Sequence, residues 1–221
     1  MKEKILDIYL ENVIESKDFA SMFHKLENLC MNKGTEGSFG ALIKYSGKNP
    51  WYNDFEIIPK LNMGDDTSVL DGLTPLINTY SESKLAKPLE EVAKIAPYFD
   101  IHNHPNGILT PSFQDLLNGF RRLNLTKGNP YFSMIVSNSK DNVFPLLLIK
   151  FNDFLGEREN IEPDLTKEYS NILNGIKQDF DKRHSTPEKL LLNSLFNEPQ
   201  KVPKGISWDY FNYNLSKRKI K

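Results

Sequence analysis

Residues 98–115 read YFDIHNHPNGILTPSFQD, and this stretch decides most of what the sequence predicts about the fold. Its first half is typical of a strand that ends at Pro105. A short loop follows, and Pro111 opens a helical pattern that we expect to continue to about Leu123. A strand that passes through a loop into a helix indicates a mixed α/β core.

Two His and one Asp in this stretch have the pattern of metal ligands. His102 and His104 are two residues apart on the strand, so their side chains project to the same face. The loop and the helix start would bring Asp115 back over the end of the strand. Two nitrogen ligands, one oxygen ligand and one open position are typical of a catalytic rather than a structural zinc site.

The composition limits the alternatives for a metal site. The chain has 221 residues, with one Cys and four His. A single Cys excludes an intramolecular disulfide and a zinc site built on Cys, so a metal must be held by His and carboxylates. His24 and His184 fall in expected helices away from the motif, which leaves His102 and His104 as the pair.

Charge and hydropathy indicate a soluble chain that does not coat nucleic acid. The 28 Lys and Arg nearly balance the 29 Asp and Glu, for a net charge of −1. The N-terminal residues MKEKILDIYL lack the apolar core of a signal peptide, and no run reaches the ~20 apolar residues of a membrane span. We therefore expect a cytoplasmic protein without a membrane partner.

The Ser112–Asp115 pair also fits a simpler pattern. Ser-x-x-Asp can form a helix capping box without any catalytic role. Thr110 before Pro111 would provide a different N-cap. We therefore expect the helix to begin at Pro111, with Ser112 and Asp115 free for other work.

The segment before this stretch is predicted to contain helices and then strands. Residues 1–34 read as a helical segment, with Ser16 as an N-cap and Gly34 as its end. Residues 35–45 and 54–61 have the character of two strands.

Further strands and short helices are expected on either side. A helix is expected at 87–95, and strands at 131–137 and 142–151. Pro145 lies within the last of these, which favours an edge strand or a bulge.

Residues 153–221 are predicted to be a helical extension. An amphipathic stripe indicates one helix, and a second begins at Thr186. The stripe consists of Leu165, Tyr169, Ile172, Ile176 and Phe180. The last 21 residues hold six Lys or Arg and four aromatic residues, and we read them as a basic aromatic tail. The expected organisation is a core at 35–152 with helical flanks on both sides.

The motif resembles the JAMM zinc motif of the JAB/MPN metalloproteases. That family has an upstream Glu, then H-x-H-P, with seven residues between the second His and a Ser, and then two residues and an Asp. His104, Ser112 and Asp115 keep this spacing, and the form H-N-H-P-x-G-x-x-T-P-S looks most like the RadC branch and its relatives. The resemblance covers about residues 35–152. It implies a JAB/MPN core, similar to cytidine deaminase, with a mixed sheet flanked by helices.

The resemblance assigns roles to individual residues. It implies that His102, His104 and Asp115 bind Zn²⁺, and that Ser112 helps to hold the oxyanion of the tetrahedral intermediate. The general base would be Glu36, although Gly40 follows it after three residues where the family has a small residue after two. Glu56 is the alternative, and its ordinary interpretation is a solvent-facing side chain on a strand.

The resulting prediction is a zinc-dependent metallopeptidase or isopeptidase that hydrolyses an amide bond with zinc-activated water. The resemblance implies a protein or peptide substrate, including ubiquitin-like modifiers joined to a lysine amine. Two alternatives stay open: a RadC-like protein associated with nucleic acid, and a non-catalytic MPN interaction module. The net charge argues against nucleic acid, and the sequence does not fix the oligomeric state.

Overall fold

The computed structural model describes residues 8–45, 53–65, 95–123, 131–152, 161–184 and 205–220. The elements are α1 (Ile8–Ile14), α2 (Lys17–Leu29), the 3₁₀ turn η1 (Met31–Lys33), β1 (Gly37–Tyr45), β2 (Asn53–Ile57), β3 (Asn62–Met63), β4 (Ile95–Asn103), α5 (Phe113–Leu123), β5 (Tyr131–Val136), β6 (Val143–Phe151), α6 (Ile161–His184), β7 (Ile206–Asn214) and β8 (Lys219–Ile220). The helix expected at 87–95 lies outside these ranges except for Ile95, which begins β4, and the helix expected from Thr186 lies wholly outside them.

One mixed sheet forms the centre of the protein. The strand order is β2-β1-β4-β5-β6-β7-β8, and β3 pairs with the start of β1. β4 and β5 run parallel, and the other pairings among the described strands are antiparallel. The chain passes from β4 to the parallel β5 through α5, as a parallel connection requires. The prediction of a mixed α/β fold is therefore confirmed.

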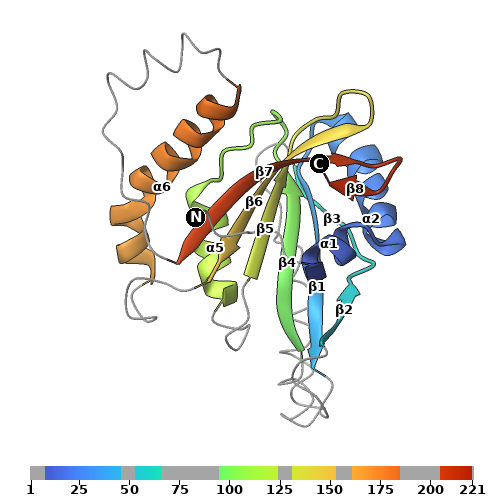
Figure 1. The fold of residues 1–221 in the computed structure, drawn as a ribbon, viewed down its shortest axis with the longest axis horizontal. Coiled ribbons are helices and arrows are strands. Elements are labelled where there is room, and N and C mark those ends of the chain that lie inside the picture. The colour runs from blue at the N-terminus through green and yellow to red at the C-terminus, as the bar shows by residue number, and fades with distance from the viewer. Residues whose placement is uncertain are drawn as a thin grey trace.

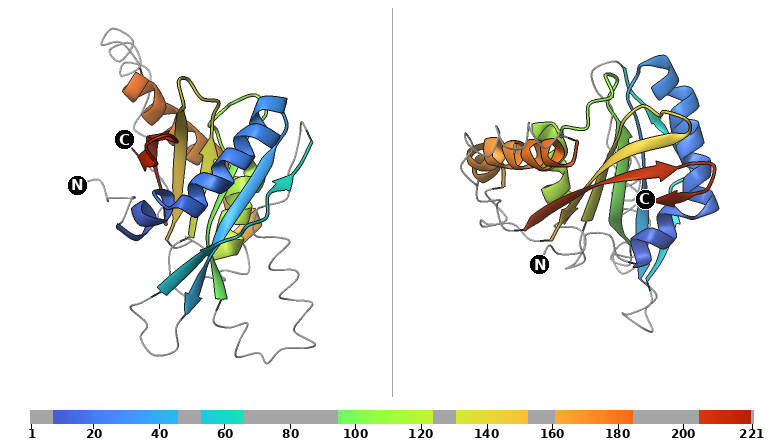
Figure 2. Two further views of the ribbon diagram at one scale, coloured as in Figure 1. Left: turned by 90° about the vertical axis from the view of Figure 1, so that its right-hand side faces the viewer. Right: turned by 45° about the horizontal axis from the view of Figure 1, so that its top comes forward.

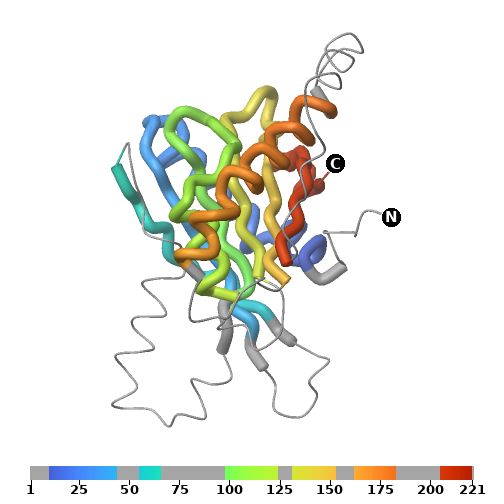
Figure 3. The backbone as a smooth tube through the Cα atoms, turned by 90° about the vertical axis from the view of Figure 1, so that its left-hand side faces the viewer, coloured from blue at the N-terminus to red at the C-terminus, as the bar shows by residue number. Residues whose placement is uncertain are grey.

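Helices cover both faces of this sheet. Figure 1 shows α1 and α2 on one side and α5 and α6 on the other. α2 runs along the outside of β1, and α5 and α6 lie together over the opposite face (Figures 2 and 3). Each side has its own apolar core, one centred on Phe19 and Phe23 of α2, the other on Leu116 and Phe120 of α5.

The N-terminal helical segment has its N-cap at Ser16 and its end at Gly34, as the sequence predicts. The Ser16 side chain caps α2 by accepting a hydrogen bond of 3.1 Å from the Phe19 amide. Gly34 ends the segment in the left-handed conformation, with φ of 70°. Both predictions are confirmed, although a short 3₁₀ turn separates α2 from Gly34.

The amphipathic stripe in the C-terminal third forms α6, as predicted. Leu165, Ile172 and Ile176 are buried against the sheet and α5. The helix therefore contributes to the core on the same side as residues 113–123.

The expectation of a helical, tail-like C-terminus is wrong for residues 205–220. They form β7 and β8, and β7 pairs with β6 along its whole length. Residues 206–210 alternate apolar or aromatic with polar side chains, and β6 needs a second partner for its backbone groups. The aromatic side chains are tied to the core: Trp208 Nε1 donates to Asp179 Oδ2 (3.2 Å) and the Tyr210 hydroxyl to the Ile176 carbonyl (3.1 Å).

The same strand overturns the expectation for Pro145. β6 has partners on both sides, so Pro145 lies in an interior strand and not at an edge. Its carbonyl accepts a hydrogen bond from the Ser137 amide at 3.0 Å.

Within the described ranges, no helix is both long and apolar enough to cross a membrane.

Candidate metal centre

The three predicted ligands converge where β4 ends. His102 and His104 project from the end of β4, and Asp115 comes from the first turn of α5. The chain between them crosses one end of the sheet (Figure 1). One ligand atom from each residue lies within 4.8 Å of the other two. The predicted convergence is confirmed, and these atoms are close enough to hold a metal ion.

Both imidazole rings are held by their Nδ1 atoms. His102 Nδ1 donates to Asp100 Oδ2 at 3.0 Å, and His104 Nδ1 donates to the Ile108 carbonyl at 2.9 Å. When Nδ1 carries the proton of a neutral imidazole, Nε2 has a free lone pair. Acceptors behind metal-binding His are the usual means of fixing ring orientation. Both Nε2 atoms are thereby presented to the same point.

Each imidazole Nε2 atom faces a different oxygen of the Asp115 carboxylate. His102 Nε2 lies 3.5 Å from Asp115 Oδ1, and His104 Nε2 lies 3.5 Å from Asp115 Oδ2. Zn²⁺ binds His nitrogen and carboxylate oxygen at about 2.0–2.2 Å, so an ion between these groups is within reach of both imidazoles and the carboxylate. His102 Nε2 is buried and has no hydrogen-bond partner among the described residues. A buried nitrogen in this position is costly unless a ligand binds to it.

Ser112 and Asp115 form the capping box that we did not expect. α5 begins at Phe113, so Ser112 and not Thr110 precedes it. The Asp115 amide donates to Ser112 Oγ (3.1 Å), and the Ser112 amide donates to Asp115 Oδ2 (2.6 Å). The capping box and the metal centre therefore use the same residues. Ser112 Oγ accepts in the cap and keeps its own hydroxyl proton available for donation.

Electrostatics favour a charged, paired state of this cluster. Burial opposes a charge on His102, but the carboxylates of Asp115 and Asp100 outweigh it and raise the pKa of His102 well above its usual value. Burial likewise opposes the Asp115 charge, but the His102 charge and the bond from the Ser112 amide hold the pKa of Asp115 well below its usual range. In the metal-free protein, the charges of this cluster are therefore paired between His102 and Asp115.

We expect metal affinity to rise with pH for this reason. The raised pKa leaves His102 protonated at neutral pH in the metal-free protein, and a metal can bind Nε2 only after that proton leaves. Zinc affinity should therefore increase about tenfold per pH unit below this pKa, with one proton released. Calorimetric titrations in buffers of different ionisation enthalpy measure both quantities. Affinity independent of pH between 5.5 and 7.5 would contradict the assignment of His102.

The loop after β4 is rigidly held. Gly107 has φ of 67°, a conformation that favours glycine, and its amide donates to the His104 carbonyl (2.9 Å). Asn106 Oδ1 accepts from the Ile108 amide, and Ser137 Oγ at the end of β5 donates to the Gly107 carbonyl at 2.6 Å. These bonds fix the Ile108 carbonyl that orients His104.

Glu36 lies beside the cluster and Glu56 does not. Ser38 pairs with His102 across β1 and β4, so continuing the register by two residues sets Glu36 opposite His104 on the same face. Burial raises the pKa of the Glu36 carboxyl, while the two imidazoles lower it and Asp115 raises it. Glu56 pairs with Leu42, six residues along β1 from Glu36, or about 20 Å. The geometry favours Glu36 as the candidate base.

Two residues near the cluster were missed from the sequence. Asp100 is two residues before His102 on the same strand face, a spacing that could have pointed to it. Tyr169 of α6 donates to the Pro111 carbonyl at 3.4 Å, and burial and the Asp115 charge raise its pKa. No local pattern predicts that Tyr169 lies near the cluster, because α6 approaches α5 only in the folded chain.

We expect Asp100→Asn to weaken zinc binding about 10–100-fold. The amide keeps an acceptor near His102 Nδ1 but loses the charge that favours the bound state. Competition titrations with a chromophoric chelator give the affinity. Asp164→Asn, which removes a partly buried carboxylate in an ion pair with Lys167 on α6, is the control and should leave affinity unchanged. Equal affinities for both variants would exclude a role for Asp100.

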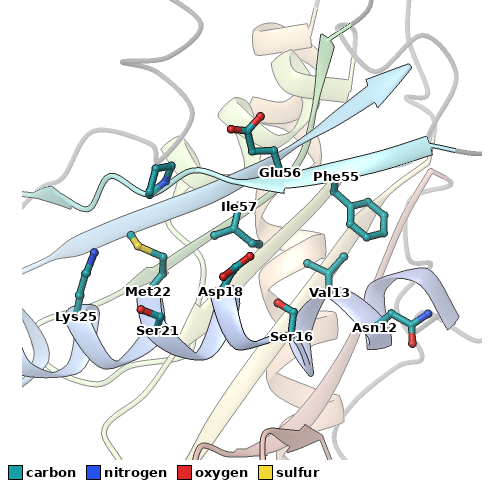
Figure 4. A pocket seen from close by; sticks show the side chains of 11 residues that line it. Asn12, Val13, Ser16, Asp18, Ser21, Met22, Lys25, Phe55, Glu56 and Ile57 are labelled. Carbon is teal, nitrogen blue, oxygen red and sulfur yellow. The ribbon is translucent and has the colours of Figure 1, made fainter. Parts of the chain in front are cut away.

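A cavity elsewhere on the molecule is separate from this centre. It has a volume of about 540 Å³ and lies between α1, α2 and the edge strand β2. In Figure 4, Phe55 and Ile57 point toward the helices α1 and α2, and Glu56 points away from them. The apolar residues packed on this side belong to the Phe19 core, on the opposite face of the sheet from α5.

Comparisons with known proteins identify no family for this chain, so the assignment of the metal centre rests on the geometry described above. No protein-family model matches the chain, and a search of curated proteins finds no significant match.

Proposed function

We propose that the protein is a zinc-dependent hydrolase of amide bonds. One observation supports this most strongly: two imidazole Nε2 atoms and a carboxylate converge, and each Nδ1 already has an acceptor. His and carboxylate ligands suit zinc better than Mg²⁺ or Ca²⁺, which prefer oxygen. The cluster contains three protein ligands among the described residues, and three ligands with one open position are typical of catalytic zinc.

The residues around the cluster have the chemistry that amide hydrolysis requires. A zinc ion held there would act as a Lewis acid and make water nucleophilic at neutral pH. Glu36 would take the proton of the attacking water and deliver it to the leaving amine. Ser112 would donate its hydroxyl proton to the negative charge that develops on the substrate carbonyl oxygen. The capping bond from the Asp115 amide orients Ser112 Oγ for this.

We further propose that the sheet with α5 is a JAB/MPN core. The JAMM-like spacing of His102, His104, Ser112 and Asp115 supports this. A protein or peptide is the substrate class that such a core implies, including a ubiquitin-like modifier linked to an amine. The aromatic residues of β7 give the nucleic-acid alternative little support, because Trp208 and Tyr213 are buried and Tyr210 is bonded to α6.

Fluorogenic amides test this function. The full-length chain is incubated with ubiquitin carrying a C-terminal aminocoumarin amide and, separately, with a library of short peptidyl aminocoumarin amides. We expect release of aminocoumarin from at least one probe, loss of release on chelation, and recovery with one equivalent of zinc. His104→Ala should abolish release. Release that survives both chelation and His104→Ala, or no release by zinc-loaded protein, would reject the proposal.

A further inference from the structure

Asn103 lies between the two His on β4 but faces the other way. Its side chain is 1% exposed and lies on the side of the sheet covered by α2. Both ends of the carboxamide make hydrogen bonds to the main chain of another segment. Asn103 Oδ1 accepts from the Gly37 amide at 2.9 Å, and Nδ2 donates to the Thr35 carbonyl at 2.9 Å.

These two bonds enclose Glu36. The Thr35 carbonyl belongs to the peptide group before Glu36, and the Gly37 amide to the peptide group after it. The main-chain groups of Glu36 itself bond on the other edge: its amide donates to the Asp65 carbonyl (2.7 Å), and its carbonyl accepts from the Gly64 amide (2.9 Å). Glu36 is therefore held from both edges although it precedes the first residue of β1.

Packing from α2 limits any other path for this backbone. A Cβ on Gly37 would overlap Cys30 Sγ and Leu26 Cδ1, so the helix presses directly on the strand at this point. Asn103 is thus hydrogen-bonded to a segment, residues 35–37, that α2 prevents from moving away from β4. Asn103, which lies between the two His ligands in the sequence, is therefore hydrogen-bonded to the segment that contains Glu36.

We infer that Asn103 is a positioning residue, which sets the location of the Glu36 carboxylate relative to the metal ligands. The inference rests on the proposed function. Proton transfer requires the base within hydrogen-bond reach of its proton, and displacement by about 1 Å from remote changes costs about 100-fold in rate. A buried Asn with satisfied bonds can also be purely structural, so the test must separate an effect transmitted through Glu36 from a general one.

The test uses Co²⁺-loaded full-length protein and acetohydroxamic acid. Cobalt reports its ligands through its visible spectrum. A hydroxamic acid binds a metal through two oxygens, and its acidic proton is accepted by a neighbouring carboxylate. Affinity for the hydroxamate therefore measures whether Glu36 is in place, without any substrate. Kd values are determined for the wild type, Glu36→Gln, Asn103→Ala and the double variant, and cobalt affinity is measured for each.

We expect Asn103→Ala and Glu36→Gln each to weaken hydroxamate binding by about tenfold or more. The double variant should be no weaker than Glu36→Gln alone, because the two changes remove one interaction. Cobalt affinity should change by less than about threefold. Asn103→Ser, whose hydroxyl can replace one of the two bonds, should bind with intermediate affinity. Thr35→Ala is the matched control: it removes the hydrogen bonds of the Thr35 side chain to Cys30 and leaves both main-chain partners of Asn103.

Several results would overturn the inference, and they differ from failure of the proposed function. Equal weakening by Asn103→Ala in both backgrounds, or loss of cobalt affinity, would make Asn103 a purely structural residue. Hydroxamate binding unchanged by Asn103→Ala and Asn103→Ser would exclude the role directly. Failure of the wild type to bind cobalt would reject the metal function and the inference together. Hydroxamate binding unchanged by Glu36→Gln in cobalt-loaded protein would reject Glu36 as the base.

Discussion

Glu36→Gln is expected to reduce amide hydrolysis by about 10²–10⁴-fold while the protein keeps its zinc. The replacement preserves shape but cannot accept a proton. Glu36 lies beside the cluster and is not one of its three ligand residues, so metal binding should not depend on it. The rate is measured with whichever aminocoumarin probe the wild type hydrolyses, and zinc content by elemental analysis of the same samples.

Glu56→Gln is the matched control for this change. It makes the same chemical replacement on the same sheet, about 20 Å from Glu36 along β1, on an exposed side chain. We expect its rate to remain within about twofold of the wild type, as for a surface replacement away from the site. A full loss of rate in Glu56→Gln with none in Glu36→Gln would reverse the assignment of the base.

Phe19→Ala should lower the free energy of unfolding by about 3–5 kcal/mol. The Phe19 ring is fully buried and contacts four aromatic rings, with centroid distances of 5.4–5.9 Å. Those rings come from α2, β1, β4 and β7, so one side chain joins the N-terminal helix to both ends of the sheet. The rings are Phe23, Phe39, Phe99 and Tyr213. Urea unfolding followed by circular dichroism measures the change.

Phe180→Ala serves as the comparison. Phe180 is 37% exposed on α6 and contacts the Tyr210 ring at 5.2 Å. Its loss should cost about 1 kcal/mol, because only part of the ring is withdrawn from water. If Phe19→Ala costs no more than Phe180→Ala, α2 does not belong to the central core.

The metal cluster could be predicted from local sequence because its geometry is local. His102 and His104 alternate with Asn103 on a strand, which by itself sets the faces of all three side chains. Asp115 follows after a short loop, so few paths of the chain could bring it elsewhere. The observed positions agree with this reasoning, including Asn103 on the face away from the ligands.

The capping residue was mispredicted because two caps compete within the same six residues. Thr110-Pro111 and Ser112-x-x-Asp115 both have capping chemistry, and sequence alone does not rank them. The folded chain selects Ser112, since Asp115 then completes the box and also meets both imidazoles. Our mistake was to treat the cap and the site as exclusive.

Long-range pairing explains what else was missed. Residues 206–210 of β7 alternate as a strand should, but the aromatic residues of β7 and the Lys and Arg residues on either side of it suggested a tail, and only β6 supplies the partner that makes it a strand. The same reasoning applies to Pro145, which reads as an edge residue until β7 covers it. Contacts such as Tyr169 with Pro111 depend on helix packing that no short pattern encodes.

The most direct test of the account is the zinc content of the protein. The full-length chain is purified without chelators and dialysed against metal-free buffer. Its zinc content is then measured by inductively coupled plasma mass spectrometry, alongside that of a variant with both His102→Ala and His104→Ala. We predict about one zinc per wild-type chain and none in the variant. A wild type that contains no zinc and binds none on addition, or a variant that retains as much zinc as the wild type, would contradict the central claim.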